Sequence, residues 1–93
     1  MKLQARIAEG VNVKVDNHPQ SIIVEFTEDK SKQRFEVMCY DFDPYQHGIR
    51  KWDIWELNVK WKSEIFEDPK TGKNSYFTYL FCTKAKPIMQ MQK

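Results

Sequence analysis

The sequence contains few of the residues that build loops, metal sites and membrane spans. Its 93 residues include only three glycines, four prolines, two cysteines and two histidines. No apolar run approaches the roughly 18 residues of a transmembrane helix, and the first residues lack the apolar core of a signal peptide. These absences argue against a membrane-spanning protein and against a disulfide-rich secreted scaffold. We therefore expect a single cytoplasmic domain.

Catalytic motifs are equally scarce. His18 and His47 lie in turn-like segments, with no serine or cysteine nucleophile at a recognised spacing. Cys39 and Cys82 form neither a CxxC pair nor a metal-ligand spacing with the histidines. Two buried free thiols are the simplest interpretation of the cysteines, and a disulfide is the alternative. We expect neither an enzyme nor a protein that needs a metal or a cofactor.

Two further groups of residues suggest chemistry only weakly. Asp41, Asp43 and Asp53 could hold a divalent cation, but short acidic side chains near turns more often cap the backbone. Gly72 and Lys73 lack the glycine-rich frame and the following helix of a phosphate-binding loop. Function must therefore be inferred from the surface of the domain.

What the sequence does contain is the two-residue alternation of β-strands. It is clearest in residues 55–62, and it continues in residues 76–83, where aromatic residues occupy both faces. Between these segments, Pro69 and Gly72 supply turn chemistry, and Pro87 is expected to end the last strand. The other predicted elements are three strands, of which the first comprises residues 3–8 and 11–15 with a bend at Gly10, and the next two are residues 21–27 and 34–42. A turn is predicted at residues 16–20.

This order of elements predicts an all-β domain over residues 1–87, followed by a tail at residues 88–93. Asp43 and Pro44 are typical of the start of a short helical turn in the link over residues 43–53. Three strands, a short helical or irregular link and two more strands match a five-stranded Greek-key barrel of the OB type. An open antiparallel sheet or a small sandwich is the alternative.

The orientation of the last two strands determines which surface is available for binding. By alternation, the face of residues 55–62 that points inward comprises Trp55, Leu57, Val59 and Trp61. Lys60 and Lys62 therefore point outward. Because small or branched side chains fit the inside of a small barrel, the inward set of the last strand is predicted to be Thr78, Leu80 and Cys82.

The outward row of the last strand then consists of Phe77, Tyr79 and Phe81, beside Lys60 and Lys62. Aromatic rings flanked by lysines are typical of proteins that bind single-stranded nucleic acid, because bases stack on the rings while lysines hold phosphates. The distribution of charge also favours a nucleic-acid site in the half of the chain that contains these strands. Residues 47–93 hold 9 basic and 5 acidic side chains, whereas residues 1–46 hold 6 basic and 8 acidic ones. Further candidates for this track are Tyr40, Trp52, Arg34, Lys70 and Lys73.

Two other interpretations of the aromatic row stay open. It could contact another protein or another copy of the chain, in an interaction or structural module such as a phage-encoded one. With the opposite orientation of the last strand, the three rings would form core. For the lysines alone, a solvated strand face is the commonest explanation.

The same residues resemble a known family. Residues 35–41, Leu57-Asn58-Val59 with its extension through Ser63-Glu64 and Gly72, and residues 76–80 are similar to small bacterial and phage OB-fold single-stranded-DNA-binding proteins, closest to the short ones of Bacteroidetes and their phages. The similarity covers roughly residues 20–87. It implies binding of single-stranded DNA with weak sequence preference, as in DNA replication. The chain lacks the acidic, glycine-rich tail by which cellular members recruit replication partners, and a homodimer or higher homo-oligomer stays open.

Overall fold

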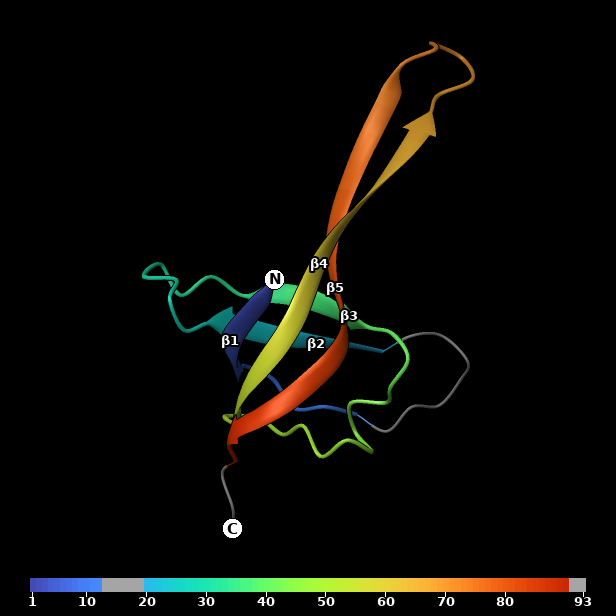
Figure 1. The fold of residues 1–93 in the computed structure, drawn as a ribbon. Coiled ribbons are helices and arrows are strands. Elements are labelled where there is room, and N and C mark those ends of the chain that lie inside the picture. Colours follow the sequence, from blue (N-terminus) through green and yellow to red (C-terminus); the bar gives the residue numbers. More distant parts are fainter. Residues whose placement is uncertain (13–19, 91–93) are drawn as a thin grey trace.

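The computed structural model describes residues 1–12 and 20–90, and every regular element in these ranges is a β-strand. The strands are β1 (Lys2–Ile7), β2 (Gln20–Phe26), β3 (Phe35–Cys39), β4 (Ile54–Glu67) and β5 (Asn74–Met89), as Figure 1 shows. The all-β prediction is confirmed. No helix that could cross a membrane is found among the described residues. His18, most of the strand and turn predicted for residues 11–20, and residues 91–93 of the predicted tail lie outside them.

The five strands form one sheet that closes into a ring in the order β1-β2-β3-β5-β4. Antiparallel pairing of β4 with β1, from Asn58 opposite Lys2 to Ile54 opposite Arg6, closes the ring. β3 and β5 are the one parallel pair of neighbours in this ring. Closure pairs the backbone groups that an open sheet would leave exposed at its edges. The open sheet considered as an alternative is therefore wrong.

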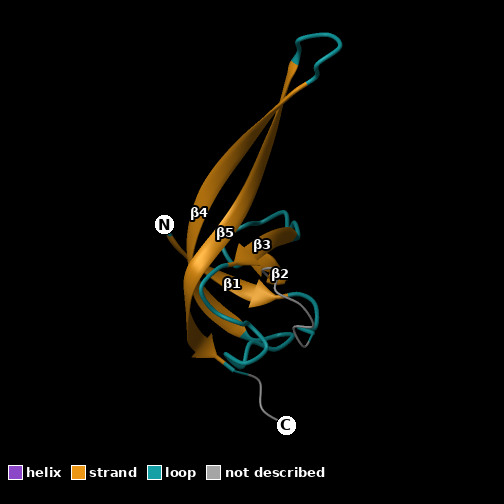
Figure 2. Ribbon diagram, turned by 90° about the vertical axis from the view of Figure 1, so that its right-hand side faces the viewer, coloured by secondary structure: helices purple, strands orange, loops and turns teal. Residues whose placement is uncertain are grey.

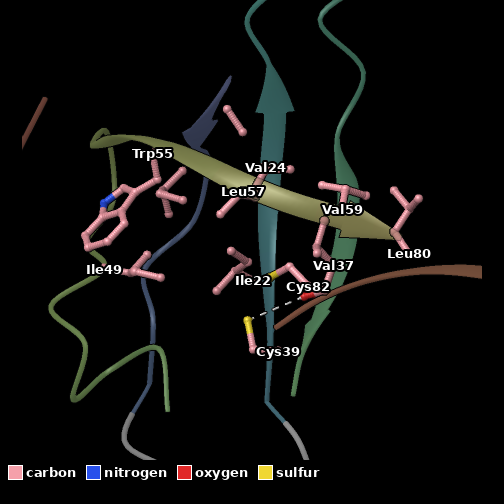
Figure 3. Packing of buried hydrophobic residues seen from close by; sticks show 12 residues of the cluster. Ile22, Val24, Val37, Cys39, Ile49, Trp55, Leu57, Val59, Leu80 and Cys82 are labelled. Carbon is pink, nitrogen blue, oxygen red and sulfur yellow. Dashed lines mark hydrogen bonds between the residues drawn. The ribbon is translucent and has the colours of Figure 1, made fainter. Parts of the chain in front are cut away.

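The core lies inside the ring, and all five strands contribute to it (Figure 3). Its buried members are Ala5, Ile7, Ile22, Val24, Val37, Cys39, Ile49, Trp55, Leu57, Val59, Leu80 and Cys82. Fully burying one large aliphatic side chain contributes about 1.5–3 kcal/mol. Trp55 is the largest member, and its indole Nε1 donates a hydrogen bond to Asp53 Oδ2 over 3.3 Å. Ile49 comes from the link between β3 and β4, so the link packs against this core.

The two cysteines are buried and free, as predicted. Cys39 on β3 lies opposite Cys82 on β5 in the parallel register. The thiol of Cys39 also donates a weak hydrogen bond to the Val37 carbonyl oxygen over 3.9 Å. A hydrogen bond with the Cys82 thiol, together with burial, raises the pKa of the Cys39 thiol above its ordinary value. Cys39 is therefore a neutral packing residue at physiological pH.

Residues 40–53, which link β3 to β4, form turns and no helix, so the irregular alternative is correct. The predicted cap is present, because Asp43 Oδ1 accepts a hydrogen bond from the Tyr45 backbone nitrogen over 2.9 Å. The predicted third strand ends early, at Cys39, and Asp41 with a φ of 68° turns the chain out of the sheet. Gly48, with a φ of 88°, ends the turn that Asp43 begins.

β4 and β5 extend beyond the ring as a twisted hairpin (Figures 1 and 2). We call residues 60–79 of this hairpin the arm. Trp61 is 63% exposed and Thr78 is exposed, so the prediction that both face the core is wrong. Each keeps its predicted side of the strand. β1 and β3 are only six and five residues long, and no other strand of residues 1–12 and 20–90 covers this side of the arm.

The prediction that Pro87 ends the last strand is also wrong, because β5 continues to Met89. Pro87 lies opposite Trp55 in the pairing with β4, beside a register shift between Ile54 and Trp55. Such irregular positions tolerate proline, which has no backbone N–H to donate to the ladder. The strand thus includes Ile88 and Met89, the first two residues of the predicted tail.

Candidate nucleic-acid interface

The aromatic row on β5 points away from the core, as the size argument predicts. Leu80 and Cys82 are buried, whereas Tyr79 and Phe81 are half-buried and Phe77 is 58% exposed. Alternate residues of a strand face opposite sides of the sheet, so burial of one set turns the other set outward. The interpretation of the row as core is therefore wrong.

The outward rings form a continuous series. Ring centroids are 6.2 Å apart between Phe77 and Tyr79, and 6.5 Å apart between Tyr79 and Phe81. Tyr40, which follows β3, extends the series with a centroid 5.2 Å from that of Phe81. The Tyr40 backbone nitrogen donates to the Cys82 carbonyl oxygen over 2.9 Å, which fixes this ring beside β5. We call these four rings the aromatic ladder.

Two lysines flank the aromatic ladder on the neighbouring strand. Lys60 is the cross-strand partner of Phe81, and Lys62 is the cross-strand partner of Tyr79. Both lysines are exposed. Directly opposite residues in an antiparallel pair have neighbouring side chains, so each lysine is the cross-strand neighbour of a ring. The predicted juxtaposition of rings and lysines is present.

A chain of hydroxyl hydrogen bonds orients the two tyrosines of the ladder. The Tyr40 hydroxyl donates to the Tyr79 hydroxyl over 3.5 Å, and the Tyr79 hydroxyl donates to Glu64 Oε1 over 3.4 Å. The contact with Tyr79 raises the pKa of Tyr40 above its ordinary value, and burial adds to this effect. Both hydroxyls are thus engaged by neighbouring side chains, and the faces of the rings remain available for other contacts.

A shallow pocket of about 230 Å³ lies beside the ladder, and Tyr40, Phe77 and Tyr79 form part of its wall. Sequence reasoning missed its other two residues, Met38 and Glu36. Both alternate with Tyr40 along β3, and this spacing was the signal that could have found them. Glu36 accepts a hydrogen bond from the Ser21 hydroxyl over 2.7 Å. The pocket is therefore aromatic on one side and carries a carboxylate on the other.

Comparison with known proteins gives this surface no assigned role. No protein-family model, curated protein or solved structure matches the chain. What the aromatic ladder does must therefore be inferred from its own geometry.

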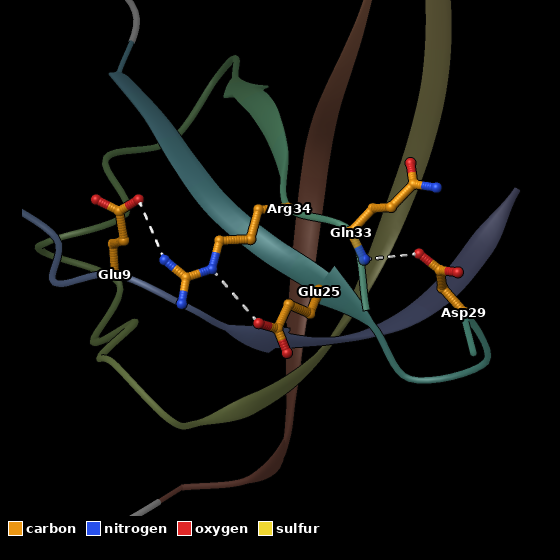
Figure 4. A network of polar contacts seen from close by, with 5 residues as sticks. All are labelled: Glu9, Glu25, Asp29, Gln33 and Arg34. Atoms are coloured by element: carbon orange, nitrogen blue, oxygen red, sulfur yellow. Dashed lines mark hydrogen bonds and ion pairs between the residues drawn. The ribbon is translucent and has the colours of Figure 1, made fainter. Parts of the chain in front are cut away.

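Arg34 does not join the ladder. Its guanidinium forms ion pairs with Glu25 over 3.5 Å and with Glu9 over 4.0 Å, as Figure 4 shows. These contacts tie the start of β3 to β2 and to the segment after β1. A phosphate at Arg34 would have to compete with two carboxylates.

Three other predicted binding residues also lie away from the ladder. Trp52 precedes β4, eight residues before Lys60, and the Lys51 ammonium lies 4.7 Å from its ring centroid. Lys70 and Lys73 belong to the turn at the tip of the arm, where the Lys70 backbone nitrogen donates to Asp68 Oδ1 over 2.9 Å. The structure thus does not bring these three residues together with the four rings.

Two aspartates near the link, Asp43 and Asp53, serve as backbone caps. Besides the cap at Asp43, the buried Asp53 accepts a hydrogen bond from the Arg50 backbone nitrogen over 3.1 Å. In residues 1–12 and 20–90, no group of histidine, cysteine and acidic side chains is arranged to hold a metal ion. Asp43 and Asp53 therefore stabilise the turns in which they lie.

Proposed function

We propose that the protein binds single-stranded DNA with weak sequence preference, by stacking bases on the aromatic ladder. The observation that carries this proposal is the outward series of four rings with Lys60 and Lys62 opposite two of them. Every base has a π-face, so stacking tolerates any sequence and contributes about 1–3 kcal/mol for each base. The half-buried rings hold one another in place, so little side-chain conformational entropy is lost when a base binds.

The strand order supports an OB-type barrel as the scaffold. The ring β1-β2-β3-β5-β4, with β3 and β5 parallel, is compatible with a five-stranded Greek-key barrel that has its link between the third and fourth strands. OB folds bind oligonucleotides on the face of their second and third strands and on the loop between the fourth and fifth. The aromatic ladder lies between these regions, because Tyr40 follows β3 and Phe77 belongs to the arm.

Charge at the ladder is nearly balanced. Lys60 and Lys62 are positive, whereas Glu64 on β4 and Glu36 in the adjacent pocket are negative. Stacking rather than attraction of phosphates therefore supplies most of the affinity at the ladder itself.

Titration of the protein with oligo-dT tests the proposal. Tryptophan and tyrosine emission should be quenched on binding, and affinity should fall as the salt concentration rises. Tyr79→Ala should weaken binding about 5- to 150-fold, which corresponds to the loss of one stacked base. Tyr76→Ala is the matched control, since Tyr76 is an exposed tyrosine on the opposite face of the arm. Absence of binding by the unmodified protein at low salt would overturn the proposal.

A second candidate function is contact with another copy of the chain through the other face of the arm. Trp61, Ile65 and Tyr76 share that face and are 62–69% exposed. Exposed apolar patches often mark protein contacts, and an isolated two-stranded hairpin is only marginally stable. Sedimentation equilibrium tests this candidate: an oligomer that persists at high salt supports it, and a monomer at all concentrations rejects it.

A further inference from the structure

A second pocket, of about 400 Å³, lies on the outer face of β4 and β5 next to the link. Three lysines from two strands, Lys2, Lys84 and Lys86, contribute to its wall, together with a single carboxylate from Glu56. Their formal charges sum to +2, from three lysines and one glutamate. No residue of this pocket belongs to the aromatic ladder.

A β-bulge creates this concentration of lysines. β4 pairs Leu57 with Ala85 but Val59 with Cys82, so two residues of β5 face the single residue Asn58. A bulge bends the strand and redirects its side chains. The bulge shifts the alternation of β5, so Lys84 and Lys86 point outward into the pocket although Cys82, two residues before Lys84, points into the core. Lys2 joins them because β1 places it directly opposite Asn58.

The three ammonium groups are available to an external anion. All three lysines are exposed, and among the described residues the only basic side chain in an ion pair is Arg34. Glu56 lies opposite Lys86 in the β-ladder, but no ion pair joins them. An incoming phosphate would therefore not have to displace a carboxylate.

The wall formed by the link is held in place by His47. A carbonyl oxygen can only accept, so His47 Nε2–H donates to the Ala85 carbonyl oxygen, over 3.1 Å. The His47 ring also packs against Phe42 and Trp55, at centroid distances of 5.3 and 5.5 Å. The pocket is therefore bounded by a fixed aromatic wall on one side and by lysines on the other.

We propose that this pocket binds phosphate groups of the same single strand whose bases stack on the aromatic ladder. Asn58, Lys60 and Lys62 alternate on the outward face of β4, so the pocket and the ladder lie on one continuous surface. Tyr79 and Lys86 are seven residues apart on β5, or about 23 Å at a rise of about 3.3 Å per residue. The inference rests on the proposed function, and it supplies the phosphate contacts that the charge-balanced ladder lacks.

A salt series with charge-matched variants tests this inference. The double variant Lys84→Gln/Lys86→Gln removes two charges from the pocket, and Lys30→Gln/Lys32→Gln removes two from the exposed connector after β2. With oligo-dT of about 15 nucleotides, the pocket variant should reduce the slope of log K against log salt by about 1.4, because each phosphate contact contributes about 0.7 for single strands. The connector variant should keep the slope of the unmodified protein. An unchanged slope in the pocket variant would overturn the inference.

The binding results together distinguish failure of the pocket assignment from failure of the proposed function. If the unmodified protein binds oligo-dT and Tyr79→Ala weakens it, but the pocket variant behaves like the unmodified protein, only the pocket assignment fails. If the unmodified protein does not bind oligo-dT at all, the proposed function itself fails.

An NMR titration with pyrophosphate tests whether the pocket prefers a small free anion to the phosphates of a DNA strand. Saturation of the Lys84 and Lys86 amide signals at a lower concentration than with oligo-dT would assign the pocket to a small phosphorylated ligand and overturn the inference.

Discussion

The hydroxyl of Tyr79 links Tyr40 to Glu64, and this small network can be separated from stacking. Tyr79→Phe keeps the ring but removes the group that accepts the Tyr40 hydrogen bond. The pKa of Tyr40 should then fall back toward its ordinary value of about 10. Binding of oligo-dT should stay within a few-fold of the original, because the stacking surface is unchanged. Titration of the tyrosine ring signals by NMR measures the pKa.

The sign of the pH effect on stability follows from the same contact. The pKa of Tyr40 is raised in the folded state. The protonated hydroxyl therefore contributes fully to the free energy of unfolding below the pKa of the unfolded state, and this contribution is lost as pH rises through the pKa of the folded state. Stability measured by urea unfolding should therefore decline less steeply above pH 10 in Tyr79→Phe than in the unmodified protein. A Tyr40 pKa that does not move in this variant would contradict the assigned hydrogen bond.

Individual site residues were predictable where they depended on local alternation. The outward lysines, Lys60 and Lys62, follow from the strict pattern of β4. The outward rings of β5 follow from the preference of a small barrel for small or branched side chains, such as those of Cys82 and Leu80, on its inside. The engagement of Arg34 was not predictable, because Glu9 and Glu25 reach it only through the pairing of β1, β2 and β3. A contact set by tertiary register leaves no local pattern in the sequence.

At the scale of the element, β4 carries two tryptophans with opposite environments. Trp55 is 1% exposed within the ring, whereas Trp61 is 63% exposed on the arm. Trp55→Ala should lower the free energy of unfolding by about 3–5 kcal/mol, because it leaves a cavity in the core. Trp61→Ala should change the free energy by no more than about 0.5 kcal/mol, as is usual for an exposed side chain. Urea unfolding measures both values, and equal losses would contradict the boundary between ring and arm.

The position of that boundary explains why Trp61 was assigned to the core. Alternation identifies the side of a strand on which a residue lies, and Trp61 does share a side with Trp55 and Val59. Whether that side is covered depends on the length of the strands opposite. β1 and β3 end before they could cover the arm, and that difference in length arises from separate parts of the sequence.

At the scale of the whole molecule, the arm makes the protein elongated. Its principal extents are 55 × 34 × 20 Å, and its radius of gyration is 15.1 Å. A compact domain of this length would have a radius of gyration of about 12 Å. The five strands and the link between the third and fourth are present in the predicted order. The sequence pattern does not show that the hairpin of β4 and β5 extends beyond the ring. The aromatic ladder lies where the ring and the arm meet, so it combines a rigid base with an extended surface.

Shortening the arm tests this division of the molecule. Ser63 and Thr78 are cross-strand partners, so residues 64–77 can be replaced by Asn-Gly, which favours a tight two-residue hairpin turn. The radius of gyration from X-ray scattering of the dilute monomer should fall toward about 12 Å. Stability to urea should change by no more than about 1 kcal/mol, since the core residues all lie outside the deleted segment. Affinity for oligo-dT should weaken through loss of Phe77, while Tyr40, Tyr79 and Phe81 keep residual binding. Loss of cooperative unfolding would instead mean that the arm is part of the folded core.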